Sequence, residues 1–233
     1  MTTCRLILFD LDDTLSYFED FWEPACKEAF AKFPLTAPLD PDRLFAAYRK
    51  WDRIMDDKYI RQEITVNEYR TRRFIEALHE VGCEADEMAA DSFHEIYFSL
   101  CGNHMKPRPE ILDLLTRLSQ KYALGLVTNG TVDVQMRKID RCGIRPFFPD
   151  EAIFISEKVG CAKPDPRIYQ AALERFKILA DETVFVGDSW PNDVRGPYEV
   201  GIRPVWLRRP DRQAPLDLPV AVLDNVCDLE TVL

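Results

Sequence analysis

The sequence predicts an α/β fold in which a doubly wound parallel sheet is interrupted by one long helical insertion. Short apolar runs rich in β-branched residues end in polar or glycine residues and alternate with segments of helical spacing. This alternation is typical of a parallel sheet covered by helices on both faces. The stretch from about 17 to 104 breaks the pattern because it contains no convincing strand.

The expected strands can be read in chain order. They are Leu6–Phe9, Ala123–Val127, Ala152–Ile155, Thr183–Val186 and Pro204–Leu207, with Val220–Leu223 as a candidate sixth. Two of the intervening segments have apolar residues close to the i, i+3, i+4, i+7 spacing of a helix: Ile111, Leu114, Leu115, Leu118 and Ile168, Ala171, Ala172, Phe176. This succession predicts a Rossmann-like core.

The long insertion is expected to be all-helical. Four helix-like pieces lie near 19–32, 41–59, 65–81 and 86–100, and prolines or glycines separate or close them. A βαβ unit needs only about 30 residues, whereas the first two strands are more than a hundred residues apart. We therefore predict an α/β core domain formed by 1–16 and 105–233, and a helical domain formed by 17–104.

Composition narrows the class of partner. The chain has 233 residues, 46% of them hydrophobic, and a formal net charge of −10. No basic stripe suits a nucleic-acid polymer, and no apolar run is long enough to span a membrane. Seven scattered cysteines without a CxxC pair suit free thiols in the cytoplasm. We expect a small-molecule partner, and the sequence leaves open whether the chain is a monomer or a homodimer.

Polar residues follow the ends of several predicted strands. Asp10 and Asp12 follow the first strand, Thr128 and Asn129 the second, and Asp188 and Asp193 a later one; Lys163 lies in a loop between two of these strands. The carboxyl ends of parallel strands meet at one edge of the sheet. Carboxylates gathered there repel one another unless a cation neutralises them, and oxygen ligands suit Mg²⁺. The sequence therefore predicts a Mg²⁺ site.

Taken in order, these residues resemble the motifs of the haloacid dehalogenase (HAD) superfamily of phosphohydrolases. The pattern DxDxT, a strand-end threonine, a lysine and GDxxxND reads here Asp10-Leu11-Asp12-Asp13-Thr14, Thr128, Lys163 and Gly187-Asp188 with Asn192-Asp193. The helical insertion after the first motif is similar to the C1-type cap of that superfamily. The resemblance covers essentially the whole chain and implies a phosphatase that acts on small-molecule phosphomonoesters with Mg²⁺.

The resemblance also implies a role for each matching residue. Asp10 would be the nucleophile that becomes an aspartyl-phosphate, and Asp12 the general acid and base. Asp10, the backbone carbonyl of Asp12, and Asp188 would bind the metal, with Asp193 completing or supporting its coordination. Thr128, Asn129 and Lys163 would bind the phosphoryl group, and Lys163 would also be catalytic because its charge balances that of the phosphoryl group and of Asp10.

Alternatives remain open on the sequence alone. A phosphosugar mutase or another HAD phosphotransferase shares the same motifs, and a regulatory protein could use the fold to bind a phosphate ligand. The dehalogenases of the superfamily fit poorly, because they lack the second aspartate that Asp12 supplies. A signalling receiver domain also fits poorly, because receivers are about half this length and carry their acidic residues on different strands.

Substrate choice is expected to lie in the cap and its entrance. Tyr17, Phe18 and Trp51 are candidates for contacting substrate, and the cap is loosely similar to that of nucleotidases that hydrolyse pyrimidine nucleoside monophosphates. Other conspicuous residues have structural interpretations. We expect solvated helix or surface positions for Arg70, Arg72, Arg73, Arg208 and Arg209, packing for Trp190, loop roles for Asp13 and Thr14, and structural or surface roles for His79, His94 and His104.

Overall fold

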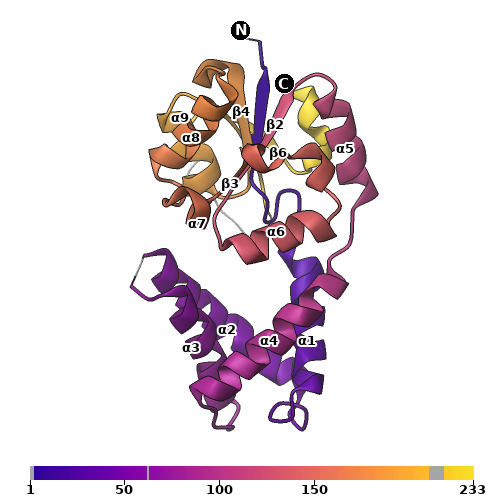
Figure 1. The fold of residues 1–233 in the computed structure, drawn as a ribbon, viewed down its shortest axis with the longest axis vertical. Coiled ribbons are helices and arrows are strands. Elements are labelled where there is room, and N and C mark those ends of the chain that lie inside the picture. Colours follow the sequence, from indigo (N-terminus) through magenta and orange to yellow (C-terminus); the bar gives the residue numbers. More distant parts are fainter. Residues whose placement is uncertain (1–2, 62, 210–217) are drawn as a thin grey trace. The chain divides into compact units, whose positions relative to one another are not determined.

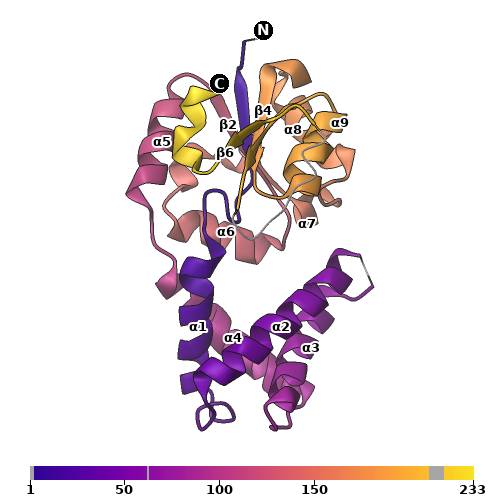
Figure 2. The ribbon, with the colours of Figure 1, turned by 180° about the vertical axis from the view of Figure 1, so that it is seen from behind.

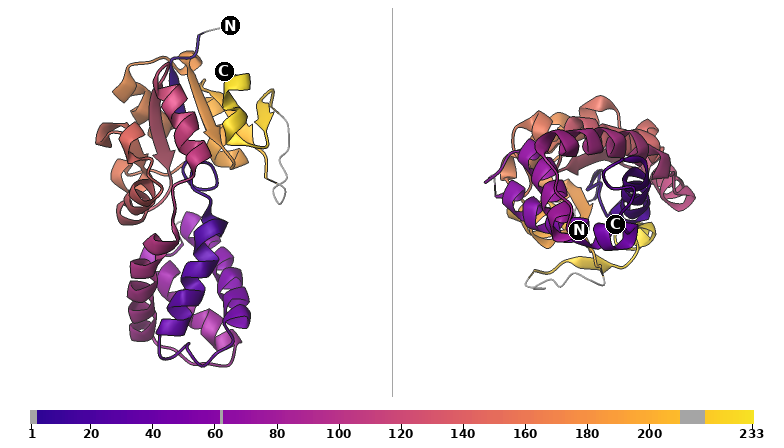
Figure 3. Two further views of the ribbon diagram at one scale, coloured as in Figure 1. Left: turned by 90° about the vertical axis from the view of Figure 1, so that its right-hand side faces the viewer. Right: turned by 90° about the horizontal axis from the view of Figure 1, so that it is seen from below.

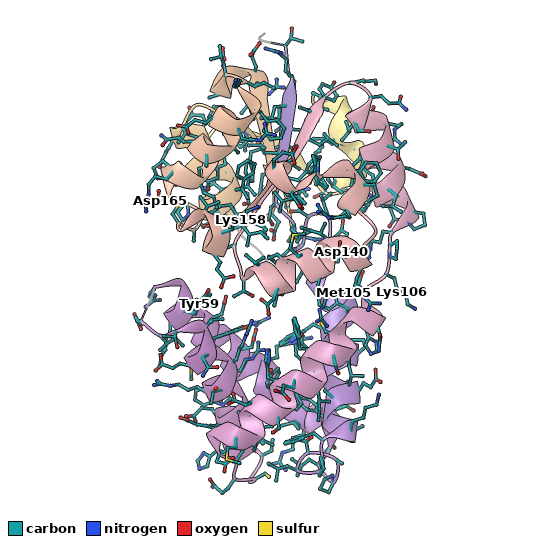
Figure 4. The ribbon with its side chains drawn as sticks, viewed as in Figure 1. Tyr59, Met105, Lys106, Asp140, Lys158 and Asp165 are labelled. Atoms are coloured by element: carbon teal, nitrogen blue, oxygen red, sulfur yellow. The ribbon has the colours of Figure 1, made fainter. Side chains whose placement is uncertain are left out.

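The computed structural model describes residues 3–61, 63–209 and 218–233, and the chain divides into two compact units. Unit 1 comprises Met1–Phe18 and Lys106–Leu233, and unit 2 comprises Glu19–Met105. Figure 4 labels Met105 and Lys106, where the chain passes from unit 2 back to unit 1. Tyr17 and Phe18 thus belong with the α/β part of the chain, and Met105 with the helical part.

Unit 1 is built on a six-stranded parallel sheet with the strand order β3-β2-β1-β4-β5-β6 (Figure 1). The strands are β1 (Leu6–Phe9), β2 (Ala123–Thr128), β3 (Ile153–Ile155), β4 (Thr183–Gly187), β5 (Arg203–Leu207) and β6 (Ala221–Leu223). The predicted fold class is confirmed, and every expected strand is present with bounds that differ by one residue at most.

Both faces of the sheet are buried, as the continuous apolar runs of its strands require. Leu6 and Leu8 of β1 pack on one face with α8, whereas Ile7 and Phe9 pack on the other with α5 and α6. The helices on the two sides can be followed in Figure 3. The longer helices of unit 1 are α5 (Pro109–Ser119), α6 (Val132–Arg141) and α8 (Pro166–Phe176).

Shorter turns complete unit 1. They are the helices α7 (Ser156–Val159) and α9 (Gly196–Glu199), the 3₁₀ turns Arg145–Phe147, Asp150–Ala152, Ala180–Glu182 and Val226–Thr231, and a π-helical turn at Trp190–Arg195.

The strand order places a topological switch point at β1. From β1 the chain builds β2 and β3 on one side and later β4, β5 and β6 on the other. In open parallel sheets, ligands bind in the crevice outside the carboxyl ends of the strands at such a point. Asp10 is the residue that follows β1, so it lies at the centre of that edge.

The described residues of unit 2 form four helices, seen from opposite sides in Figures 1 and 2: α1 (Phe18–Lys32), whose first residue belongs to unit 1, α2 (Pro41–Ile60), α3 (Val66–Glu80) and α4 (Glu87–His104). The side chains of Asp40 and Asp86 cap the first turns of α2 and α4, and Thr65 forms a capping box with Glu68 on α3. These contacts satisfy backbone amides that a helix start leaves without partners. The four predicted helices are present, α4 extending four residues beyond its expected end.

No described helix has both the length and the apolar composition needed to cross a membrane.

One arginine expected on a solvated helix face is buried instead. Arg73 is 6% exposed and lies inside unit 2. Its guanidinium donates to Asp52 at 2.5 Å and to the hydroxyl of Tyr69 at 2.7 Å, and it stacks over the rings of Tyr48 and Tyr69. The expectation was wrong because an arginine on a helix carries no local sign of a buried partner on the neighbouring helix. Arg72 is exposed and pairs with Glu68, as expected.

Candidate active site

The parallel register brings three predicted site residues to one edge of the sheet. Phe9 of β1 pairs with Leu126 of β2 and with Val186 of β4, so the strand ends lie level. Asp10 follows Phe9 directly, and its amide donates to the carbonyl of Val186 at 2.9 Å. Thr128 ends β2, and Asp188 follows the last residue of β4.

Lys163 lies between two aspartates at this edge. Its ammonium nitrogen is 2.7 Å from Oδ1 of Asp10 and 2.6 Å from Oδ1 of Asp193, and its side chain is only 3% exposed. Burial works to lower the pKa of Lys163, but Asp10 and Asp193 outweigh it and raise the pKa above its usual value. Lys163 therefore stays protonated and supplies a fixed positive charge.

The loop that carries Lys163 is held by Asn129. The side-chain oxygen of Asn129 accepts from the backbone amide of Lys163 at 2.8 Å, and its amide nitrogen donates to the Lys163 carbonyl at 3.0 Å. The side chain of Asn129 thus links the end of β2 to the lysine loop. Because the side chain of Asn129 is engaged with this loop, the backbone amide of Asn129 is the group that could bind a phosphate as predicted.

Three carboxylates form a compact oxygen cluster. Asp10, Asp188 and Asp193 are buried and each offers one oxygen, and these oxygens lie within 4.8 Å of one another. Burial raises the pKa of Asp10 well above its usual range against the opposing effect of Lys163, and Asp193 and Asp188 raise it further. The crowding is electrostatically unfavourable, and a cation bound among these oxygens would relieve it.

A glycine and a tryptophan set the position of this cluster. A Cβ atom on Gly187 would lie 2.4 Å from Cγ of Asp193, so only glycine allows that carboxylate to approach the end of β4. Asp193 also accepts from the amide of Ser189 at 2.9 Å. Trp206 of β5 donates its indole N–H to the carbonyl of Asp188 at 2.9 Å. Trp190 packs edge-on against Trp206, in agreement with the packing role expected of it.

The carboxylate of Asp12 is held apart from the cluster. Its Oδ1 lies 2.6 Å from Nζ of Lys138, and its Oδ2 accepts from Nε2 of Gln135 at 2.9 Å. The loop turns sharply after Asp12: Asp13 has a φ of 57° and its amide donates to the carbonyl of Ser16. Asp10 contacts Lys163 whereas Asp12 contacts Lys138 and Gln135, so the two carboxylates have separate surroundings.

Gln135 and Lys138 are site residues that the sequence analysis missed. Both lie on α6, and both are buried although they are polar. The position of Gln135 on α6 could have indicated its role, because Gln135 lies on the apolar face of this helix, four residues before the fully buried Ile139. A glutamine at a core position of an amphipathic helix needs a buried partner, and the strand-end residues supply it.

The two threonines of the motifs are buried. Thr128 is 1% exposed and its hydroxyl accepts from Nε2 of Gln135 at 2.8 Å. Thr14 is fully buried in the turn after Asp12, and its hydroxyl has no hydrogen-bond partner among the described residues.

Tyr17 lies between two arginines of unit 1. The guanidinium carbons of Arg108 and Arg209 are 4.0 Å and 4.5 Å from the centre of its ring. Arg209 also donates to the carbonyl of Asp13. The expectation of a solvated Arg209 was wrong, because its partners come from the loop after β1, whereas Arg208 is exposed and pairs with Asp224, as expected.

The other specificity candidates lie in or next to unit 2. The indole N–H of Trp51 donates to Glu80 at 2.8 Å, which ties α2 to α3. The side chain of Phe18 lies outside the described part of the structure. His104 contacts Glu28 at 2.6 Å, and His79 is exposed near Glu84. These histidine contacts agree with structural or surface roles.

Comparison with known proteins identifies the family. A family model described as haloacid dehalogenase-like hydrolase matches residues 4–201. The chain belongs to this family. The family expected from the ordered motifs is confirmed.

Relatives with similar sequences span nearly the whole chain. The glyceraldehyde 3-phosphate phosphatase of Methanopyrus kandleri is 29% identical over 97% of this chain and 92% of its own length. The pyrimidine 5'-nucleotidase YjjG of Escherichia coli is 26% identical over 97% of this chain and 96% of its own. The magnesium-bound crystal structure of the HAD-hydrolase YfnB of Bacillus subtilis is similar with a TM-score of 0.83, 26% identity and 99% of both chains covered.

Proposed function

We propose that this HAD-like hydrolase is a Mg²⁺-dependent phosphatase that hydrolyses small-molecule phosphomonoesters through a phosphorylated Asp10. The observation that carries the proposal is the contact of Lys163 with Asp10 and Asp193, at 2.7 and 2.6 Å, within a cluster of three buried carboxylates. Relatives named as phosphatases and as a nucleotidase support the same class of reaction.

The carboxylate cluster fits a magnesium ion. Mg²⁺ prefers hard oxygen ligands at about 2.1 Å, which places opposite ligands about 4.2 Å apart. The oxygens of Asp10, Asp188 and Asp193 lie within 4.8 Å of one another, so small movements suffice. The ion, held by these carboxylates and the backbone carbonyl of Asp12, would draw negative charge from the phosphoryl group.

The protein's own residues can perform both halves of the hydrolysis. An oxygen of Asp10 attacks phosphorus, and the bond to the leaving oxygen breaks as Asp12 gives that oxygen a proton. Asp12 then takes a proton from water, the water oxygen attacks phosphorus, and the bond to Asp10 breaks. Inorganic phosphate leaves, and Asp10 and Asp12 return to their starting forms.

Charge and hydrogen bonding would hold the phosphoryl group. A phosphate dianion approaching Asp10 is repelled, and the ammonium of Lys163 reduces this repulsion from a fixed position. The hydroxyl of Thr128 and the backbone amides after β2 lie at the same strand edge and would bind phosphoryl oxygens.

The test is phosphate release from purified protein. We expect hydrolysis of an aryl phosphate with Mg²⁺, loss of activity with EDTA, and loss of at least about a thousandfold in kcat for Asp10→Asn. Asp181→Asn, which changes an exposed aspartate in the same unit, is the matched control. Full activity of Asp10→Asn, or phosphate release that continues in EDTA, would refute the proposal.

A panel of substrates tests which class of phosphomonoester the protein hydrolyses. It contains nucleoside monophosphates, triose and hexose phosphates and phosphoserine, with products analysed as well as phosphate. Pyrimidine nucleoside monophosphates are the candidate class of substrate. Equal rates of hydrolysis for nucleotides and sugar phosphates would exclude this class. Appearance of an isomerised sugar phosphate without free phosphate would instead identify a mutase.

A further inference from the structure

Two residues of α6 contact the carboxylate of Asp12, which acts as the acid and base in the proposed reaction. Lys138 reaches Oδ1 of Asp12 at 2.6 Å, and Gln135 reaches Oδ2 at 2.9 Å. They stand three residues apart on one helix, so both side chains project from the same side of α6. Each oxygen of Asp12 therefore has its own donor.

We infer that Gln135 and Lys138 are positioning residues that fix the carboxylate of Asp12 for proton transfer and keep it out of the metal-binding cluster. The inference rests on the proposed phosphatase function. Neither residue belongs to the matched motifs, and neither is expected to touch the phosphoryl group.

Lys138 is more deeply buried than the carboxylate that it contacts. The side chain of Lys138 is 8% exposed, whereas that of Asp12 is 32% exposed. The lysine thus approaches from the protein interior and leaves part of the carboxylate open. A leaving oxygen or a water molecule needs this open part to exchange a proton with Asp12.

The side-chain amide of Gln135 links Asp12 to the end of β2. Its Nε2 faces three acceptors: Oδ2 of Asp12, the hydroxyl of Thr128 and the carbonyl of Asn129, at 2.9, 2.8 and 2.8 Å. Its Oε1 is buried and has no hydrogen-bond partner among the described residues. A buried carbonyl without a partner is unfavourable, so the amide orientation is determined by what Nε2 binds. Gln135 thereby connects Asp12 to the predicted phosphate-binding strand end.

The carboxylate of Asp12 is separate from the three carboxylates of the cluster. The oxygen cluster contains Asp10, Asp188 and Asp193, and among the described residues Asp12 is not part of it. A carboxylate two residues from Asp10 would be attracted to any divalent ion in that cluster. The ammonium of Lys138 offers a competing partner and holds Asp12 to one side.

The test compares substrates that differ in how much they need a proton at the leaving oxygen. An activated aryl phosphate such as p-nitrophenyl phosphate needs little help, whereas an alkyl phosphate such as glycerol 2-phosphate needs an acid. We expect Lys138→Met to lower kcat/KM about 10- to 100-fold on the alkyl ester, which at most reaches the lower end of the roughly 10²–10⁴-fold that general acid catalysis contributes, because the acid itself remains. The loss on the aryl ester should be several-fold smaller. Gln135→Met should show the same pattern with a smaller loss.

Conservative replacement separates positioning from structural damage. Lys138→Arg keeps a cation on the same helix position and should recover most of the alkyl-ester activity. Lys121→Met, which removes an exposed lysine of the same unit, should leave both rates unchanged. Should Lys138→Met fail to fold, Lys138→Gln takes its place, because it keeps a hydrogen-bond donor and removes the charge.

Three outcomes would overturn the inference: unchanged kcat/KM in Lys138→Met on both esters, an equal loss on both, or an arginine variant as slow as the methionine variant. A wild-type protein without phosphatase activity would instead refute the proposed function. The two failures are therefore distinguishable.

Discussion

Replacing Lys163 by methionine should change stability and metal affinity in opposite directions. The ammonium of Lys163 makes two charged hydrogen bonds, at 2.7 Å to Asp10 and 2.6 Å to Asp193, in surroundings that leave its side chain 3% exposed. A hydrogen bond to a charged group contributes about 1.5–3 kcal/mol. Removing one partner of a buried ion pair costs about 3–5 kcal/mol because the remaining charge is left uncompensated.

We therefore expect Lys163→Met to lower the free energy of unfolding by about 3–5 kcal/mol when EDTA is present. Magnesium affinity should rise, because the cluster of Asp10, Asp188 and Asp193 loses its competing cation. Ligand binding at about 100 times the dissociation constant adds about 2.7 kcal/mol of stability, so saturating Mg²⁺ should recover much of the loss. Catalysis should remain severely reduced, because the fixed charge beside Asp10 is gone.

The assay is urea unfolding followed by circular dichroism, with EDTA and across a Mg²⁺ titration, alongside calorimetric titration of the metal. Lys121→Met is the control, since its ion pair with Glu230 is exposed and worth at most about 1 kcal/mol. A loss below about 1 kcal/mol for Lys163→Met, or a magnesium affinity that stays equal or weakens, would show that the electrostatic reasoning is wrong.

Two further predictions concern packing and pH. Gly187→Ala should displace Asp193, whose Cγ would lie 2.4 Å from the new Cβ, and so reduce both Mg²⁺ affinity and activity; wild-type calorimetric titrations would contradict this. Burial, followed by Asp52 and Asp57, raises the pKa of Asp56 in unit 2 to about 6. Its folded pKa exceeds the unfolded value, so the contribution of Asp56 to stability should fall as pH rises from about 4 to 6. Asp56→Asn should accordingly be more stable than the wild type by about 3 kcal/mol at pH 7.5 and nearly equal to it at pH 4, and a pH-independent difference in urea unfolding would refute this prediction.

The sheet edge at which the candidate active site lies could be predicted, because its position depends on local sequence and on one general rule about parallel strands. Apolar runs that end in Asp10, in Thr128 and in Gly187-Asp188 mark strand ends without knowledge of long-range contacts. Parallel strands then place those ends side by side. The helical insertion was predictable for the same reason, since the prolines and glycines that separate or close its helix-like pieces are local signals.

The partners of these residues could not be predicted, because they depend on distant contacts. Lys138 and Asp12 are 126 residues apart, and Arg73 and Asp52 lie on different helices. A lysine or arginine on a helix is solvated in most proteins, and only the packed structure shows which one is buried against a carboxylate. Arg209, whose partners Tyr17 and Asp13 lie near the other end of the chain, was misread for this reason.

The two buried lysines divide the charges of the site into two parts. Asp10, Asp188 and Asp193 together with Lys163 carry a formal charge of −2 when the carboxylates are ionised, which one divalent cation balances. In the part of the cycle in which Asp12 is ionised, it forms a neutral pair with Lys138 beside this group. If Asp12 joined the first group, the charge would become −3, and the carboxylate needed for proton transfer would be drawn toward the ion. In the proposed mechanism Lys163 would thus set the charge that a bound metal ion meets, while Lys138 would keep the fourth carboxylate available for the leaving group.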